Sequence, residues 1–335
     1  MSFSTIIGQE QLKRRLGTSL AGDPGHAFLF TGPTGAGKTL VARAFGKALL
    51  CQTPSEAGAC GQCVACRLFD EGVHPDWRSL VSKDGKGIRV EQVRTDIVAD
   101  VSLYSQMGGR KVYLVDADHL NEQGQNALLK TIEEPPPHVC ILMTASGPER
   151  LAGTIVSRMA HFPLARSTPE ELRRILTGAG ISEELPALPF LLRYARGIPG
   201  VALELATDTW FIQVREEVLD RMASVGEKDR AVLLTETYGF FNREKDHADT
   251  LLDVAGTYVR DLALVASGAR ETLLLNADRR GAILDLVRRN RYDIAQLDRA
   301  GAAVQHARRC LTLNTNFETT ICSLLLQLRK ELAHA

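Results

Sequence analysis

The stretch FLFTGPTGAGKTLVARAF, residues 28–45, decides the fold of this chain. Its apolar start has the composition of a buried strand, and TLVARAF has the apolar spacing of a helix. Between them GPTGAGKT, residues 32–39, matches the pattern G-x-x-x-x-G-K-[ST]. In that pattern glycines let backbone amides turn toward phosphate oxygens at the start of a helix. The stretch therefore predicts a phosphate-binding loop between a strand and a helix.

Two residues of this loop have specific expected roles toward a nucleotide. The amine of Lys38 would reach the β and γ phosphates, and the hydroxyl of Thr39 would hold magnesium. An accidental glycine-rich turn is the alternative, and the strand before the loop and the helix after it argue against that alternative. We expect ATP and Mg2+ to bind at Gly32, Pro33, Thr34, Gly35, Ala36, Gly37, Lys38 and Thr39.

Further strands and helices alternate along the first half of the chain. KVYLVDAD (111–118) and VCILMTAS (139–146) are apolar enough for buried strands, and helical NEQGQNALLKTIEE (121–134) separates them. Such alternation implies an α/β fold with a parallel sheet covered on both faces. After about residue 165 the strand signals fade and the segments become helical. The sequence predicts an α/β nucleotide-binding domain (1–165), a short helical lid (166–207) and an all-α C-terminal domain (208–335).

Composition narrows the class of protein. The chain has 335 residues, 44% of them apolar, and 40 Lys plus Arg balance 40 Asp plus Glu. No global basic charge argues for wrapping nucleic acid, so a nucleic-acid contact would need a local patch. We see neither a signal peptide nor an apolar span of membrane length, so we expect a cytoplasmic protein with no membrane partner.

The strand-like VYLVDADHL, residues 112–120, supplies a second part of a nucleotide site. Asp116 is placed to bind magnesium through water beside Thr39, and a solvated carboxylate at a strand end is the alternative. The next residue is Ala117, whose methyl group cannot accept a proton from an attacking water. Asp118 would share the strand face of Asp116 if the strand continued that far. The sequence thus predicts nucleotide binding with impaired hydrolysis.

Four of the seven cysteines crowd into residues 51–66. Their spacing is C-x8-C-x2-C-x2-C, which brings three thiolates into one tight turn while the longer loop returns the fourth. Four thiolates with tetrahedral reach favour zinc, and a fully occupied set indicates a structural ion. The remaining cysteines, Cys140, Cys310 and Cys322, have apolar neighbours and are expected in the core. The predicted zinc ligands are Cys51, Cys60, Cys63 and Cys66.

Together these segments resemble the clamp-loader branch of the AAA+ ATPases, and within it the delta-prime family of bacterial DNA polymerase III subunits. The resemblance is strong over residues 1 to about 205. NALLKTIEEPP followed by SR is far more specific than a phosphate loop alone. The resemblance rests on GQEQLKRRL (8–16), HAFLFTGPTGAGKT (26–39), the four-cysteine insertion, HPDW (74–77), QNALLKTIEEPPPHVCILMTAS (125–146) and IVSRM (155–159).

The resemblance implies roles for further residues. In the family a Ser-Arg-Cys motif offers its arginine to ATP held by the neighbouring subunit, and Ser157-Arg158-Met159 occupies this place. It also implies a polar γ-phosphate sensor near Thr144 and Ser146, without deciding between them. Motor subunits carry an arginine in the lid helix, whereas GIPGVALELA (197–206) has no cation, and Arg196 comes one turn early.

The resemblance therefore implies a stator subunit, which supports ATP hydrolysis in a neighbour and has little or none of its own. Its implied partners are clamp-loader subunits of the gamma/tau and delta types, with the sliding clamp and primed DNA reached through the assembled complex. The C-terminal domain would form the oligomerisation collar. One alternative is a gamma/tau-type motor subunit, and another is a stand-alone ATPase. A nucleic-acid-binding zinc module is disfavoured because QTPSEAGACGQCVAC (52–66) contains no lysine or arginine.

Overall fold

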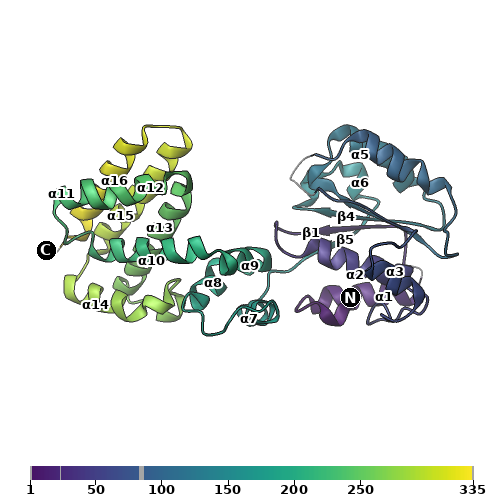
Figure 1. Cartoon of the computed structure of the whole chain (residues 1–335), viewed down its shortest axis with the longest axis horizontal. Coiled ribbons are helices and arrows are strands. Elements are labelled where there is room, and N and C mark those ends of the chain that lie inside the picture. Colours follow the sequence, from purple (N-terminus) through teal and green to yellow (C-terminus); the bar gives the residue numbers. More distant parts are fainter. Residues whose placement is uncertain (1, 23, 83–86, 334–335) are drawn as a thin grey trace. The chain divides into compact units, whose positions relative to one another are not determined.

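The structure is a computed structural model that describes residues 2–22, 24–82 and 87–333 (Figure 1). The outermost positions of the expected first and third domains, Met1, His334 and Ala335, lie outside these ranges. Contacts divide the chain into two compact units. The α/β unit comprises Met1–Gly178 and Gly197–Val201, and the helical unit comprises Ala179–Arg196 and Ala202–Ala335. The three-domain division with boundaries near 165 and 207 stays a prediction.

The α/β unit is built on a five-stranded sheet in the order β2-β3-β4-β1-β5, and every neighbouring pair is parallel. The predicted parallel α/β fold is therefore confirmed. Register places the end of β3 beside β4, with Asp116 opposite Thr144, and Thr144 opposite Phe30 of β1. The strands are β1 (Ala27–Thr31), β2 (Trp77–Leu80), β3 (Lys111–Asp116), β4 (Val139–Ala145) and β5 (Ala160–Pro163).

Helices cover both faces of this sheet, as Figure 1 shows for α1 and α2 on one side and α5 and α6 on the other. Alternate strand residues point to opposite faces, so Phe28 and Phe30 pack with α1 and α2 while Leu29 packs with the second face. The helices of this unit are α1 (Glu10–Ala21), α2 (Lys38–Leu50), α3 (Val64–Asp70), α4 (Val90–Val93), α5 (Glu122–Glu133), α6 (Gly153–Val156) and α7 (Pro169–Gly178).

The second unit consists of helices. Its last two helices, α15 and α16, are separated by residues 313–316. Cys310 and Cys322 lie on these amphipathic helices, half-buried, so their predicted core position is wrong, whereas Cys140 is buried as predicted. The elements are α8 (Leu188–Tyr194), α9 (Pro199–Thr207, shared with the first unit), α10 (Thr209–Ser224), α11 (Arg230–Val232), α12 (Tyr238–Arg243), α13 (Ala248–Ala266), α14 (Arg280–Asn290), α15 (Ile294–Thr312) and α16 (Phe317–Leu332).

A buried arginine ties the helical unit together. Arg215 of α10 is inaccessible to solvent and donates to both carboxylate oxygens of Asp278, at 2.8 and 2.9 Å, and to Asn276 at 2.9 Å. Its guanidinium also lies 4.1 Å from the ring centroid of Phe190 in α8. Removing one partner of such a buried ion pair typically costs about 3–5 kcal/mol. The arginine that this pair holds in place also packs on α8 through Phe190.

Among the residues that the structure describes, no helix combines the length and the apolar character that crossing a bilayer requires.

Candidate functional site

The glycine-rich loop between β1 and α2 has the backbone of a phosphate cradle. Gly35 and Gly37 adopt φ angles of 82° and 93°, a region that residues with a Cβ atom rarely enter. Gly37 is the N-cap of α2, so the helix begins at Lys38 and its unpaired amides and positive dipole end lie at the loop. The predicted strand, turn and helix are therefore in place around this loop.

Lys38 folds back onto its own loop. Its amine donates to the carbonyl oxygens of Gly32 at 2.7 Å and Pro33 at 3.2 Å. Burial lowers the pKa of Lys38 below its ordinary value, although the nearby carboxylates of Asp118 and Asp116 oppose that shift. The ammonium group is thus available near the cradle to an anion that replaces the two carbonyls.

The start of α9 covers the same loop with backbone atoms. The amide of Gly200 donates to the carbonyl oxygen of Gly35 at 2.8 Å. A Cβ atom on Gly200 would lie 2.6 Å from the Cα atom of Gly35, so only glycine permits this approach. Neither neighbour of Gly200 in this cover, Pro199 or Val201, carries a charge. Sequence reasoning saw that this segment lacks a cation but did not find its contact with the loop.

Strand β3 ends at Asp116, so the strand predicted over residues 111–118 is two residues too long. Residues 117–119 instead form a 3₁₀ turn, and His119 Nδ1 lies 2.9 Å from Asp116 Oδ2. The Ala117 side chain is buried in the core rather than placed toward solvent. Asp118 Oδ1 accepts hydrogen bonds from the amide and the hydroxyl of Ser146, at 2.9 and 2.8 Å.

These contacts distinguish Thr144 from Ser146, the two candidates for the γ-phosphate sensor. Thr144 is buried at the carboxyl end of β4, directly beside Asp116 in the sheet. Ser146 directs its hydroxyl to Asp118, which also accepts the Ser146 amide and is thereby engaged in holding the end of β4. The glycine loop, Lys38 and Asp116 fit a nucleotide with magnesium. Asp118 is the carboxylate best placed to act as a catalytic base instead of Ala117, but it already accepts two hydrogen bonds from Ser146.

Arg158 lies at the surface just after α6. Its side chain is 42% exposed, while Met159 next to it is buried among the residues of the core that contains Ile155. The methionine that replaces the family's cysteine therefore anchors the segment by packing. An exposed guanidinium on an anchored backbone can reach phosphoryl oxygens of another molecule. Sequence reasoning placed this arginine from the resemblance alone and missed its neighbour Glu133.

The four cysteines converge as predicted. Their sulfur atoms all lie within 4.8 Å of one another, with Cys51–Cys63 and Cys60–Cys66 separations of 3.9 Å. Cys51 directly follows α2, Cys63 is the N-cap of α3, and Cys66 lies within α3. The cluster could hold a metal ion, and its four sulfur ligands leave no position for water in a tetrahedral site.

Electrostatics of the metal-free cluster favour a cation. Burial raises the pKa of Cys66 to about 12. In contrast, hydrogen bonds from the Thr53 side chain and the backbone amides of Gln62 and Cys63 lower the pKa of Cys60 to about 5. Four neighbouring thiols cannot all ionise without a nearby positive charge. A metal ion would supply that charge and displace the remaining protons.

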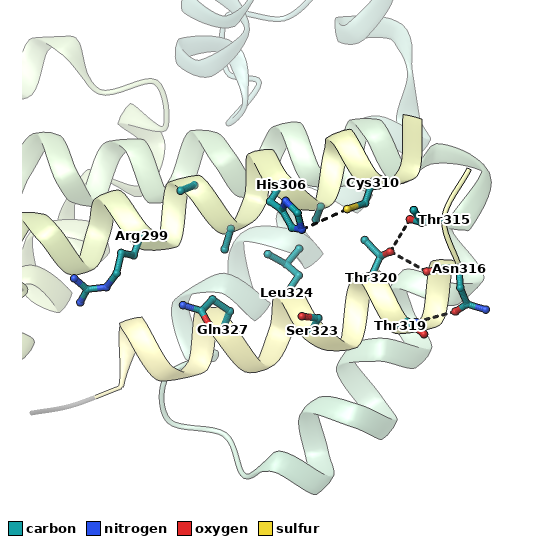
Figure 2. A pocket seen from close by; sticks show the side chains of 13 residues that line it. Arg299, His306, Cys310, Thr315, Asn316, Thr319, Thr320, Ser323, Leu324 and Gln327 are labelled. Atoms are coloured by element: carbon teal, nitrogen blue, oxygen red, sulfur yellow. Dashed lines mark hydrogen bonds between the residues drawn. The ribbon is translucent and has the colours of Figure 1, made fainter. Parts of the chain in front are cut away.

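A separate cavity of about 640 Å3 lies between α15 and α16 in the helical unit (Figure 2). Small side chains such as Ala302, Ala303 and Ala307 line it, and a His306–Cys310 contact of 3.5 Å lies on α15. It has no glycine loop, and the nucleotide-site residues described above belong to the other unit.

Comparison with known proteins places these features in one family. A family model described as "DNA polymerase III, delta subunit" matches residues 8–168. The chain is 32% identical over 314 residues to DNA polymerase III subunit delta' of Escherichia coli, covering 92% of this chain and 90% of that protein. It is 42% identical over 186 residues to subunit delta' of Pseudomonas aeruginosa, covering 54% and 55%.

Subunit tau of Escherichia coli is also similar, at 36% identity over 255 residues. That alignment covers 73% of this chain but 39% of tau. This chain therefore spans much less than two thirds of tau, and nearly all of one delta' relative. The match along nearly the whole length of a delta' subunit, together with the parallel sheet and the four-cysteine cluster, shows that the chain belongs to the DNA polymerase III clamp-loader subunits of the AAA+ type and is delta-prime-like.

Proposed function

We propose that this chain is the stator of a clamp loader, with little or no ATPase activity of its own, and that it supplies Arg158 to ATP held by a neighbouring subunit. One observation carries the proposal: a half-exposed arginine stands on an anchored segment of a chain whose own site places a buried alanine after Asp116. A guanidinium supplied in trans can raise phosphoryl transfer by orders of magnitude. The group through which this chain would promote ATP hydrolysis, the Arg158 guanidinium, therefore lies at its surface.

Its own loop is proposed to bind a nucleotide. The amine of Lys38 would exchange the carbonyls of Gly32 and Pro33 for phosphate oxygens, and Thr39 with Asp116 would hold the magnesium ion. Magnesium, when bound, neutralises charge on the β and γ phosphates. Hydrolysis is expected to be weak because the Ala117 methyl cannot polarise water and Asp118 is engaged by Ser146.

The four-cysteine cluster is proposed to hold a structural zinc ion. Cys51, Cys60, Cys63 and Cys66 would each supply one thiolate. The ion would fix the loop between α2 and α3 and would take no part in catalysis, since no position remains open for water.

The proposed partners follow from the family. They are gamma/tau-type and delta-type subunits, met through the C-terminal helices, with the sliding clamp and primed DNA engaged by the complete assembly.

A gamma/tau-type motor is the second candidate, because tau relatives match this chain at 36% identity. A motor subunit would hydrolyse ATP by itself, as would a stand-alone ATPase. The buried methyl of Ala117 and the uncharged cover formed by residues 199–201 argue against both.

The decisive experiment measures ATP turnover by the isolated chain and by the reconstituted complex. We expect negligible turnover by the isolated chain, and turnover by the complex that falls at least about tenfold with Arg158→Ala. Thermal unfolding of the variant should match the wild type because Arg158 is half-exposed. Robust turnover by the isolated chain that Lys38→Ala abolishes would favour the motor, and unchanged turnover by the Arg158→Ala complex would remove the role in trans.

A further inference from the structure

Arg158 makes two hydrogen bonds and one ion pair within its own chain. Its Nη1 atom donates to the carbonyl oxygen of Thr154 at 2.9 Å and lies 3.3 Å from the hydroxyl of Ser157. Its Nη2 atom lies 3.1 Å from Oε1 of Glu133, the last residue of α5. Thr154 and Ser157 are close in sequence, whereas Glu133 reaches the guanidinium from another helix and carries the opposite charge.

The backbones of Glu133 and Arg158 are fixed relative to each other. Gln125 of α5 donates through Nε2 to the carbonyl oxygen of Arg150, at 2.9 Å. Its Oε1 atom accepts from the amide of Ala152 at 2.9 Å, so Gln125 clamps α5 to the segment that begins α6. Both hydrogen bonds are largely shielded from water, which makes this clamp a stable reference between the two helices.

Packing strengthens the same connection. Ile132 precedes Glu133 in the chain and Met159 follows Arg158, and both are buried in one hydrophobic core with Ile155. Each charged residue therefore stands on a backbone whose neighbour is locked in the core. The ion pair therefore joins two side chains, Glu133 and Arg158, whose backbones are both held by buried neighbours.

An arginine with free rotamers loses entropy when it binds an anion. An acceptor that already restricts the guanidinium removes part of that loss. Among the residues that the structure describes, the Nε atom of Arg158 has no hydrogen-bond partner, so its N–H group stays available for a phosphoryl oxygen. Water screens the charge of Glu133 toward an incoming phosphate, because both side chains are 42% exposed.

We propose that Glu133 is a positioning residue for Arg158, which restrains the guanidinium and thereby raises the turnover of ATP in the neighbouring subunit. This inference rests on the proposed role of Arg158 in trans. It adds to that role a residue from the IEEPP segment, whose side chain does not itself need to meet the nucleotide.

The test is ATP turnover by the reconstituted clamp loader carrying Glu133→Ala, Glu133→Gln or Glu134→Ala in this subunit. We expect Glu133→Ala to lower kcat about two- to fivefold, the size of an exposed ion pair, with KM for ATP unchanged. Glu133→Gln removes the charge that makes the ion pair with little change of shape, so it should lower kcat to a similar extent. Glu134→Ala removes the adjacent charge from the same helix end and should leave kcat unchanged.

Testing Glu133→Ala in a subunit that already carries Arg158→Ala distinguishes a positioning role of Glu133 from a general effect on the structure. When Arg158 is already alanine, Glu133→Ala should lower turnover no further, since Glu133 acts through Arg158. An unchanged or raised kcat in Glu133→Ala, or an equal loss in both backgrounds, would overturn the inference. If Arg158→Ala lowers turnover while Glu133→Ala does not, only the positioning role is lost. If Arg158→Ala itself changes nothing, the proposed function is lost as well.

Discussion

Helix α2 carries a different candidate site at each end. At its start, Lys38 and the glycine loop form the proposed cradle for phosphate, and at its end Cys51 begins the four-cysteine cluster. All four sulfur ligands come from residues 51–66, whereas the cradle depends on Asp116 of β3 and on Gly200 of α9. The comparison teaches that a short motif can specify a whole metal site but only part of a nucleotide site.

The two helix ends also differ in electrostatics. The amino end of α2 carries the positive end of the helix dipole, which favours an anion without further charge. Cys51 lies at the negative end, where several thiolates would repel one another and the helix. A bound metal ion would offset that repulsion, so we expect the carboxyl end to depend on a metal for stability and the amino end not to.

The largest expected effect comes from breaking the metal end. Cys66→Ser should reduce bound zinc from about one ion per chain to a small fraction and lower the free energy of unfolding by about 4 kcal/mol or more. Lys38→Ala, at the opposite end, should cost less than about 1 kcal/mol. Metal content and chemical denaturation measure both effects.

Cys310→Ser provides the matched control for the metal end, because Cys310 is a half-buried cysteine outside the cluster. It should keep the zinc content of the wild type. Equal metal content in Cys66→Ser and wild type would show that the cluster does not hold the ion.

An intermediate effect is expected from pH, and it should act on the two ends in opposite directions. Zinc needs thiolates, so metal should be retained at neutral pH and lost as the pH falls and protons compete for the four sulfur atoms. Burial lowers the pKa of Lys38, so as the pH rises its ammonium should lose a proton at a lower pH than an exposed lysine would. Nucleotide affinity should therefore weaken on the alkaline side.

One titration series tests both directions in the same sample. Zinc release to a chromogenic chelator and binding of a fluorescent ATP analogue would be followed from acidic to alkaline pH. Loss of both ligands on the same side of neutrality would contradict the comparison.

The smallest expected effect comes from the distant support of the cradle. Gly200→Ala places a Cβ atom 2.6 Å from the Cα atom of Gly35, so the start of α9 must shift. We expect a loss of about 1–3 kcal/mol in the free energy of unfolding and a weaker fit to ATP, with zinc content unchanged. Gly178→Ala is the control, since its added Cβ meets no atom within 4 Å. A Gly200→Ala protein with wild-type stability and ATP affinity would show that the cover is dispensable.

Sequence patterns predicted the central strands well and the edge strands not at all. β1, β3 and β4 are continuous apolar runs because both of their faces are covered by helices. The missed strands, β2 and β5, lie at the two edges of the sheet, are four residues long, and each has only one fully buried residue. Arg78 in β2 and Pro163 in β5 fit such edges but not a buried-strand pattern.

The candidate site was predictable only where its residues are close in sequence. The cysteine spacing and the glycine loop were visible, because their geometry is set by short stretches of backbone. The partners of Arg158 and Gly35, namely Glu133 and Gly200, come from other elements and follow only from tertiary packing. Hydrophobic neighbours misled the assignment of Cys310, since a helix with one apolar face still exposes part of its flank.

The contact between Gly200 and Gly35 has a consequence for how the protein is made. The α/β unit is not one continuous stretch, because residues 197–201 return to it after an excursion through residues 179–196. During synthesis from the amino terminus, the sheet can close once β5 is complete, yet the phosphate loop still lacks its cover. That cover forms only after α8 and the first turn of α9 have emerged, so the glycine loop is completed later than the sheet on which it stands.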